Sequence, residues 1–296
     1  MKTPQTRSAI DRLPEHRARK RFGQNFLHDP TVIQRIIHAI NPQAGQHLVE
    51  IGPGQAALTT HLLSCGATLD VIELDRDLAG WLHSRFGQED DFCVHQADVL
   101  KFDIGALQQD TRLLRIIGNL PYNISTPCLF HLLRYHAQIE DMVFMLQHEV
   151  VQRLAAGVGD PAYGRLGIMM QYFCAVEPLF MVPPGAFRPQ PKVNSAIVRL
   201  RPYRELPLQA KDFSCLQKVV RTAFNQRRKT LKNSLSTLIS ATDSSQLPID
   251  LSLRPENLGL ADYIAISDAI TDASGSPADS SGEHHHAEPG THSRQD

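Results

Sequence analysis

Short apolar runs bounded by turn residues divide most of the chain into segments of strand length. They lie at residues 47–51, 69–73, 92–95, 113–117, 142–146 and 196–200. Segments between several of these runs, such as 32–40 and 127–133, repeat apolar residues at helical spacing instead. Strands that alternate with helices predict an α/β fold in which a parallel sheet is covered on both faces.

The helical segment at 32–40 carries boundary signals at both ends. Asp29 and Pro30 suit an N-cap and a first helical turn. Asn41 and Pro42 directly follow the last apolar residue of the segment, where a helix is expected to stop. We therefore predict a helix between these two signals.

A glycine turn follows the first predicted strand. The sequence Gly52-Pro53-Gly54-Gln55-Ala56-Ala57 leads into a helix that we expect to run from Leu58 to Gly66. Glycines let the backbone approach a ligand closely, and a helix N-terminus offers free N–H groups. Glu73 ends the next strand about 20 residues later, where an acid that binds a ribose is expected. Because this turn also satisfies the nicotinamide-cofactor fingerprint, it does not choose the cofactor by itself.

Asp98 follows the strand at 92–95. An acid at a strand end could bind an adenine amine, or it could simply cap a turn. Both interpretations stay open on the sequence alone.

The loop 118–123 (GNLPYN) follows the buried strand at 113–117. Open α/β sheets bind ligands at the carboxyl ends of their strands. The Asn119 amide, the peptide carbonyl before Pro121 and the Tyr122 ring could together hold a planar ring that bears an amine. The alternative is a polar turn with one buried Tyr, because short motifs often match by chance.

Basic residues are concentrated in two places, although the net charge is only −1. Residues 1–30 hold seven Lys/Arg against three Asp/Glu, and residues 211–233 hold seven against one. The tail 271–296 holds one Lys/Arg against five Asp/Glu. This asymmetry favours a nucleic-acid-binding face masked by an acidic tail. A charge run is more often a solvated helix face, so that alternative stays open.

Changes in composition along the chain mark the domain boundaries that we predict. Residues 1–17 form a flexible N-terminal segment, and residues 18–202 form the main α/β domain. Residues 203–270 form a small all-helical domain with a basic edge, since apolar residues recur there at helical spacing. Residues 271–296 form a disordered acidic tail, in which His284–His286 lack partner ligands, so we predict no metal site.

No apolar run approaches the roughly 18–20 residues that span a bilayer, and no signal peptide is apparent. The five cysteines are widely spaced, which is typical of reduced, buried thiols in the cytosol. We therefore expect a cytoplasmic protein with no membrane association. We also expect a monomer.

Five ordered segments closely resemble the ribosomal RNA adenine dimethyltransferase family. They are 19–27 (RKRFGQNFL), 49–59 (VEIGPGQAALT), 118–125 (GNLPYNIS), 187–196 (FRPQPKVNSA) and 223–235 (AFNQRRKTLKNSL). The resemblance covers about residues 17–265 and is closest to the bacterial small-subunit enzymes. It implies a Rossmann-like class I fold that uses S-adenosylmethionine. It also implies N6-dimethylation of two adjacent adenosines in the 3′-terminal hairpin of 16S rRNA, with a role in small-subunit biogenesis.

The resemblance also implies roles for single residues. The cofactor ligands are Asn25, Leu27, Gly52, Glu73, Asp98 and Asn119. The catalytic set is Asn119, Leu120, Pro121, Tyr122 and Phe187, in which the rings of Tyr122 and Phe187 stack on the two faces of an extruded base. The RNA contacts that we expect are Arg19, Lys20, Arg21, Lys192, Arg221, Arg227, Arg228, Lys229 and Lys232. One departure is Ala56, where the family usually has glycine. If this position needs a positive φ, the alanine costs on the order of 1 kcal/mol.

Three alternative functions differ from this interpretation in class or substrate. A resistance-type methyltransferase would modify one adenine of the large subunit. A ribosome-assembly checkpoint would bind immature small subunits with little catalysis. A dehydrogenase is disfavoured because the sequence lacks an acid/base constellation for hydride transfer.

Overall fold

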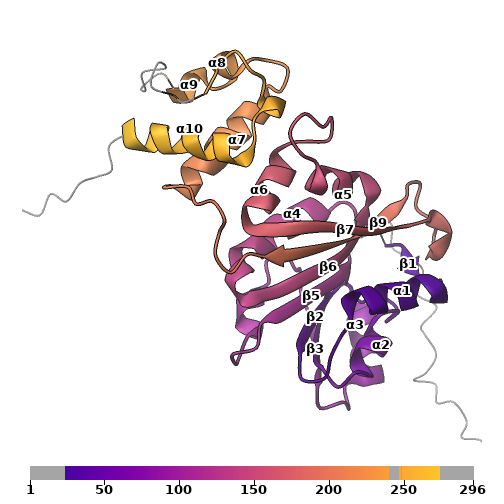
Figure 1. Cartoon of the computed structure of the whole chain (residues 1–296). Helices are drawn as coiled ribbons and strands as arrows, with labels where there is room; N and C mark the ends of the chain where they lie inside the picture. The colour runs from indigo at the N-terminus through magenta and orange to yellow at the C-terminus, as the bar shows by residue number, and fades with distance from the viewer. Residues whose placement is uncertain (1–23, 240–246, 248, 274–296) are drawn as a thin grey trace, which may run out of the picture.

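A seven-stranded sheet forms the centre of the molecule (Figure 1). The structure is a computed structural model that describes residues 24–239, 247 and 249–273. The strands of the sheet are β2 (His47–Ile51), β3 (Thr68–Glu73), β4 (Phe92–Gln96), β5 (Leu114–Asn119), β6 (Ile139–Gln147), β7 (Cys174–Val182) and β9 (Ser195–Pro202). Their order across the sheet is β4-β3-β2-β5-β6-β9-β7.

Only β9 runs against the other strands of this sheet. The strands from β4 to β6 pair in parallel, whereas β9 is antiparallel to both of its neighbours, β6 and β7. The prediction of a wholly parallel sheet is therefore wrong at this edge. The reason is the connection from β7 to β9, residues 183–194, which contains no crossover helix and so reverses the chain direction.

Helices cover both faces of the sheet, as the alternation of strands and helices predicts. The helices α1 (Pro30–Ile40), α2 (Thr59–Leu63) and α3 (Arg76–Phe86) pack on one face, and α4 (Ser125–Leu132), α5 (His148–Ala155) and α6 (Arg165–Phe173) pack on the other. Successive residues of β2 show the two cores: Leu48 packs with the first group and Val49 with the second. Short 3₁₀ turns η3 (Ile104–Leu107), η4 (Leu133–Gln138), η5 (Pro184–Ala186) and η7 (Pro255–Asn257) complete the chain path.

Both predicted boundaries of α1 are confirmed. The Asp29 carboxylate accepts hydrogen bonds from the N–H groups of Thr31 and Val32 at 2.8 and 3.1 Å. Asn41 ends the helix in the left-handed region with φ 48°. The buried Arg115 guanidinium donates to the Ile40 carbonyl at 2.7 Å, which fixes this helix end against the sheet.

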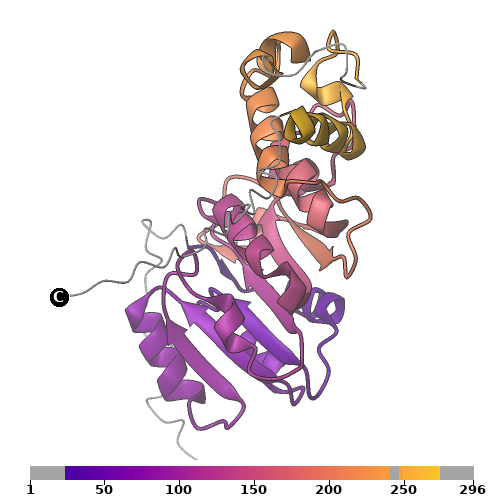
Figure 2. The ribbon, with the colours of Figure 1, turned by 90° about the vertical axis from the view of Figure 1, so that its left-hand side faces the viewer.

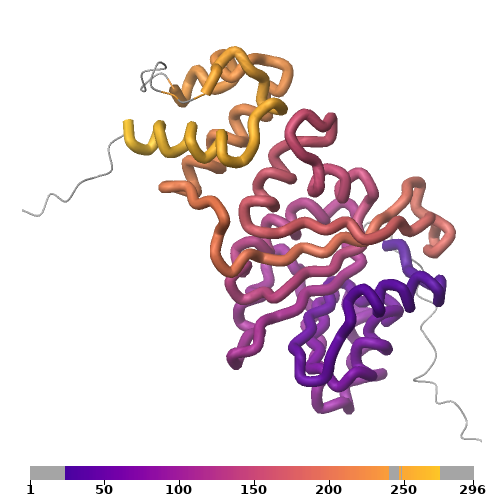
Figure 3. Tube along the Cα trace, viewed as in Figure 1, coloured from indigo at the N-terminus to yellow at the C-terminus, as the bar shows by residue number. Residues whose placement is uncertain are grey.

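The segment that precedes α1 is tied to a distant part of the chain. Strand β1 (Phe26–Leu27) pairs antiparallel with β8 (Phe187–Arg188), so that Leu27 lies opposite Phe187. The His28 N–H also donates to the Ala186 carbonyl at 2.9 Å. Figure 3 shows these two segments side by side on the side of the sheet that carries α1.

After β9 the described chain is helical. The helices α7 (Phe213–Asn225), α8 (Leu231–Ser234), α9 (Ser236–Ile239) and α10 (Leu260–Ala273) lie beyond one end of the sheet (Figure 2). They reach the main core through aromatic contacts, for example Phe213 stacked on Tyr172 of α6 with ring centroids 5.3 Å apart. The tail predicted from Thr271 begins too early, since α10 continues to Ala273. Residues 1–17 and 274–296 lie outside the described residues.

The cysteine prediction is only partly right. All five thiols are free, and Cys128 and Cys174 are buried as expected. Cys93, however, is exposed, because it lies on the edge strand β4. Within the described ranges, every helix is too short or too polar to cross a bilayer.

Candidate active site at the strand ends

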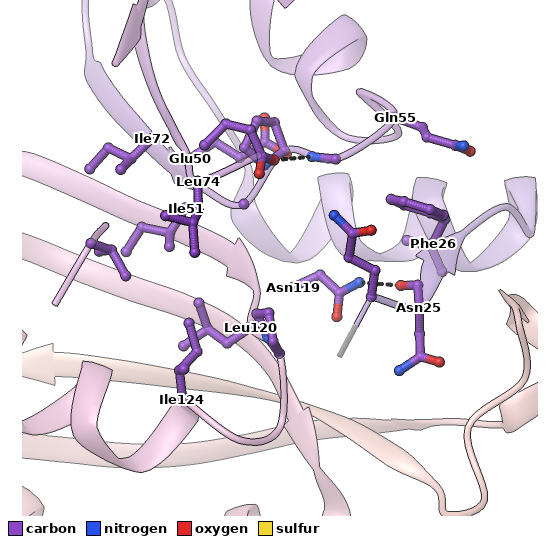
Figure 4. A pocket seen from close by; sticks show the side chains of 18 of the residues that line it. Asn25, Phe26, Glu50, Ile51, Gln55, Ile72, Leu74, Asn119, Leu120 and Ile124 are labelled. Atoms are coloured by element: carbon purple, nitrogen blue, oxygen red, sulfur yellow. Dashed lines mark hydrogen bonds between the residues drawn. The ribbon is translucent and has the colours of Figure 1, made fainter. Parts of the chain in front are cut away.

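A pocket lies where the carboxyl ends of four neighbouring parallel strands meet (Figure 4). Gly52 follows β2, Glu73 ends β3, Asp98 follows β4 and Asn119 ends β5. Because these strands are parallel and adjacent, their last residues face the same space. Residues 24–27 form a further wall of the pocket. Nine predicted site residues line it: Asn25, Leu27, Gly52, Glu73, Asp98, Asn119, Leu120, Pro121 and Tyr122.

The glycine turn lines the pocket as a loop and not as a helix start. Helix α2 begins only at Thr59, one residue later than predicted, and it has five residues. Gly52 and Gly54 have φ of +66° and +56°, a region that favours glycine. A Cβ on Gly54 would also lie 3.2 Å from the Phe26 ring, so this glycine lets Phe26 approach the turn. The backbone of this loop, rather than a helix N-terminus, therefore faces the pocket.

Ala56 occupies the same turn with φ +61°. The backbone strain expected for an alanine at a positive φ is therefore present at this position. The methyl group is buried at 5% exposure and packs in the α1–α3 core. The position thus combines backbone strain with an apolar contact.

The Glu73 carboxylate is held in a fixed orientation. Its two oxygens accept hydrogen bonds from the N–H groups of Gly54 at 3.2 Å and Asp75 at 2.8 Å. Burial raises the pKa of this carboxyl, and the two backbone hydrogen bonds partly oppose that rise. An acceptor so placed suits a ligand hydroxyl that approaches along the strand end.

Glu50 and Leu74 are among the residues of the pocket wall that were not predicted as part of the site. Glu50 is buried, accepts a hydrogen bond from the Thr59 hydroxyl at 2.6 Å, and has its pKa raised to about 7 by burial. Leu74 lines the pocket with a side chain that is 50% exposed. The position of Glu50 inside the apolar run 47–51 (HLVEI) could have marked it as a functional residue, since a buried acid is unusual. A leucine after a strand-end acid gives no comparable signal.

Asp98 both caps a turn and lines the pocket, so its structure agrees with both interpretations of its sequence position. Its Oδ1 accepts a hydrogen bond from the Leu100 N–H at 3.0 Å, which caps the turn after β4. The residue also lines the pocket. Since the turn uses one carboxylate oxygen, the capping bond orients the side chain without excluding a ligand.

Asn119 connects the end of β5 to the wall formed by residues 24–27. Its side-chain Nδ2 donates to the backbone carbonyl of Asn25 at 3.1 Å (Figure 4). This bond fixes the orientation of the side-chain amide: Nδ2 points towards Asn25, and the Oδ1 acceptor points away from it. The next peptide is also fixed, because the Leu120 N–H donates to the Met145 carbonyl of β6 at 3.3 Å.

The Tyr122 ring is half-buried and is held at its far end. Its hydroxyl lies 2.8 Å from Oγ of Ser195, which is fully buried at the first position of β9. Desolvation raises the pKa of the phenol, so it is neutral at ordinary pH. Ser195 belongs to the segment 187–196 that sequence analysis singled out, yet this residue was not predicted as part of the site.

Phe187 lies outside the pocket, so in this structure it does not provide a second ring for stacking on a base. Its side chain is 1% exposed, packs in the α1–α3 core and does not line the pocket. The antiparallel pairing with Leu27 in β1 explains this position, since it turns the side chain of Phe187 into the core. In the described structure the pocket therefore offers one of the two predicted rings.

Four of the nine predicted basic contacts form an exposed surface on the C-terminal helical part. Arg221 lies on α7, Arg228 and Lys229 on the following turn, and Lys232 on α8; all four are exposed. Lys192 is also exposed, on the connection between β8 and β9. Arg19, Lys20 and Arg21 lie outside the described residues.

Arg227 differs from these neighbours. It is half-buried, donates to the Pro161 carbonyl at 2.8 Å and pairs with Glu256 at 3.5 Å. These contacts join α7 to the loop before α6 and to the turn before α10. The guanidinium is therefore engaged within the protein, and the RNA contact of Arg227 stays a prediction.

Comparisons with known proteins agree with this geometry. Residues 15–272 match the family model for ribosomal RNA adenine dimethylase. The chain is 59% identical over 264 residues to ribosomal RNA small subunit methyltransferase A of Marinobacter nauticus, covering 89% of this chain and 95% of that protein. It is 56% identical to the protein of the same name from Pseudomonas aeruginosa, covering 90% of this chain and 99% of that protein.

Solved structures show the same fold. A dimethyladenosine transferase from Plasmodium falciparum superposes with a TM-score of 0.68 at 26% identity, over 81% of this chain and 95% of that chain. The 23S rRNA methyltransferase ErmE superposes with a TM-score of 0.63 at 22% identity, over 83% and 99%. The chain thus belongs to the ribosomal RNA adenine dimethylase family, whose members are S-adenosylmethionine-dependent methyltransferases.

Proposed function

We propose that this chain transfers methyl groups from S-adenosylmethionine to the N6 amines of two adjacent adenosines in the 3′-terminal hairpin loop of 16S rRNA. The products are N6-dimethyladenosines, and the partner is the small ribosomal subunit during its assembly in the cytoplasm. The names and high identity of the Marinobacter and Pseudomonas relatives support the choice of subunit. The arrangement of Asn119 in the pocket carries the chemical part of the proposal.

The residues of the pocket fit S-adenosylmethionine. The Glu73 carboxylate suits the ribose hydroxyls and the half-buried Asp98 suits the adenine amine. Gly52 lines the pocket, and a Cβ there would meet no atom within 4 Å, so the turn has room beside it for the methionine part. Leu74 offers an exposed apolar face for the adenine ring. When bound, this cofactor supplies a methyl group that its sulfonium has already activated, so the protein need not supply a nucleophile.

The task left to the protein is to prepare the adenine amine. The lone pair of this nitrogen is delocalised into the ring, which makes it a poor nucleophile. Two acceptors aimed at its hydrogens favour a pyramidal nitrogen and free the lone pair for in-line attack. Asn119 Oδ1 and the Leu120 carbonyl are suited to this role. The hydrogen bond to Asn25 fixes the Asn119 side chain, and the bond from the Leu120 N–H to the Met145 carbonyl holds the residue that carries the second acceptor against β6. Such positioning can supply roughly 7–11 kcal/mol of barrier reduction.

Tyr122 and the basic surface would hold the RNA. Stacking of an extruded base on an aromatic ring contributes roughly 1–3 kcal/mol. A second ring from Phe187 would require β8 to separate from β1, so we assign the stacking in this conformation to Tyr122 alone. We assign phosphate contacts to Lys192 and to Arg221, Arg228, Lys229 and Lys232 of the helical part, residues 203–270, together with Arg19, Lys20 and Arg21.

Labelled methyl transfer to purified subunits tests the proposal. Small subunits that lack the modification should accept label from S-adenosylmethionine, and mapping should place all of it on the two adjacent hairpin adenosines. Large subunits from the same cells are the matched control and should stay unlabelled. Label on a large-subunit adenine, or no label on either particle, would contradict the proposed function.

A further inference from the structure

A second group of chemically reactive side chains lies on the edge of the sheet, away from the pocket. The group consists of Asp70 on β3 and Cys93 and His95 on β4. Their donor atoms all lie within 4.8 Å of one another. Neither the proposed methyl transfer nor the pocket uses any of them. We propose that these three residues bind one divalent transition-metal ion of the zinc class.

The strand register explains why the three side chains converge. Asp70 lies directly opposite Cys93 in the parallel pair β3–β4, so both side chains leave the same face of the sheet. His95 follows Cys93 by two residues and therefore points to that face as well. All three positions belong to regular strands, which hold ligands more firmly than a loop does.

The donor set suits zinc and its neighbours better than magnesium or calcium. A thiolate and an imidazole are soft or borderline ligands, which hard cations such as Mg²⁺ avoid. One thiolate and one carboxylate would also neutralise a dication. Ligands of a tetrahedral zinc ion lie roughly 3.3–3.8 Å apart, given metal–ligand distances of about 2.0–2.3 Å. Asp70 Oδ1 and His95 Nε2, now 2.6 Å apart, would need to separate by about 1 Å.

A fourth residue orients the carboxylate. His47 of β2 is buried, and its Nε2 lies 2.6 Å from Asp70 Oδ2. Oδ1 of the same carboxylate lies 2.6 Å from His95 Nε2. Residues that hold a ligand in this way are a regular part of metal sites and increase their affinity. His95 is in turn packed against the Phe102 ring, with centroids 5.2 Å apart.

The site is open to solvent on the outer side. Cys93 is exposed, and the His95 side chain is 25% exposed, since β4 is the edge strand. An ion can therefore enter without unfolding, and a water molecule can complete its coordination. Asp70 precedes Glu73 by three residues, about 10 Å along β3, and His95 precedes Asp98 by three residues. An ion here would join the two strands whose ends form the cofactor side of the pocket.

Cobalt spectroscopy of the full chain tests the proposal, since Co²⁺ replaces Zn²⁺ and a thiolate ligand gives a sulfur-to-cobalt charge-transfer band. His284, His285 and His286 are changed to Ala in every variant, because three consecutive histidines bind metal unspecifically. One equivalent of Co²⁺ should produce the band, and Zn²⁺ should displace it. The band should vanish in Cys93→Ser and persist in Cys65→Ser. Cys65 is a suitable control because its half-buried thiol donates to the Leu62 carbonyl and lies outside the proposed site.

Thermal unfolding gives a second measurement that does not depend on cobalt. Zn²⁺ at 100 times its Kd should raise Tm on the order of 5 °C. The increase should be absent in Cys93→Ser and in His95→Gln, two solvent-accessible substitutions whose folding is checked by circular dichroism. A missing charge-transfer band, a band that survives Cys93→Ser, or a Tm increase that survives both substitutions would overturn the proposal. Asp70 would then act only as the hydrogen-bond partner of the two histidines.

Discussion

The pocket and the basic helical surface solve different problems with different kinds of residue. In the pocket, Asn119, Glu73 and Tyr122 are each partly or fully buried and held by a hydrogen bond to a distant element. On the helices, Arg221 and Lys229 are exposed and lie beside other charges of the same sign. A fixed acceptor or ring loses its function when it moves by an ångström, whereas a charge in a cluster is replaced by its neighbours. Single substitutions should therefore have large effects in the pocket and small ones on the surface.

The strongest test of this contrast is Asn119→Ala. Removal of one fixed acceptor should slow methyl transfer roughly 100-fold or more, because the amine is no longer steered towards attack. Single-turnover transfer to small subunits measures this step directly. Binding of the same particles should stay within about twofold of wild type, since the change removes no charge. Near-normal methylation would contradict the role assigned to Asn119.

The surface needs several substitutions at once to show a comparable effect. Changing Arg221, Arg228, Lys229 and Lys232 together to Ala should weaken small-subunit binding at least roughly tenfold. The slope of log Kd against log salt should decrease by roughly 3, because four phosphate contacts are lost. Filter binding at several salt concentrations measures both quantities. An unchanged slope would show that these charges are only a solvated surface.

Arg227→Ala is the matched control for that experiment. It removes the same kind of charge from the same segment, but its guanidinium contacts Pro161 and Glu256. The salt slope should therefore stay unchanged, while Tm falls slightly. A slope change as large as that of a surface arginine would mean that Arg227 contacts RNA after all.

The Ser195–Tyr122 hydrogen bond should have an intermediate effect. Either Ser195→Ala or Tyr122→Phe should lower kcat/KM for RNA about fivefold, since a hydrogen bond of this type contributes about 1 kcal/mol. If the serine acts only through the tyrosine, the double variant should match the single ones. Ser267→Ala, a change at another fully buried serine, controls for loss of stability. Additive effects would show that Ser195 does not act by orienting the ring.

The sequence predicts the pocket better than the surroundings that hold it in place. The run HLVEI between polar residues and a glycine predicts β2 with the observed ends, and the next run, at 69–73, predicts Glu73 as the last residue of β3. The direction of β9 could not be predicted, because a strand pattern is the same read forwards or backwards. The positions of Phe187 and Arg227 depend on partners far away in the sequence, Leu27 for one and Pro161 and Glu256 for the other. The local pattern of apolar and polar residues does not indicate that a side chain is buried by residues far away in the sequence.

The smallest expected effect concerns the strained backbone of the pocket turn. Ala56→Gly relieves a left-handed conformation that costs an alanine about 1–2 kcal/mol. The same change removes a buried methyl group, which destabilises the folded state by about 0.8 kcal/mol. It also increases the conformational entropy of the unfolded chain, which stabilises the unfolded state by about 0.4–1 kcal/mol. These terms nearly cancel, so the free energy of unfolding should change by less than about 0.5 kcal/mol in urea denaturation.

Gly45→Ala is the converse control, since Gly45 has φ +77° and a Cβ there would meet nothing within 4 Å. It should destabilise the protein by about 0.5–1 kcal/mol, because it adds strain without a compensating contact. Equal effects of opposite sign for the two variants would show that the Ala56 methyl contributes no packing energy, and that strain alone separates the two turns.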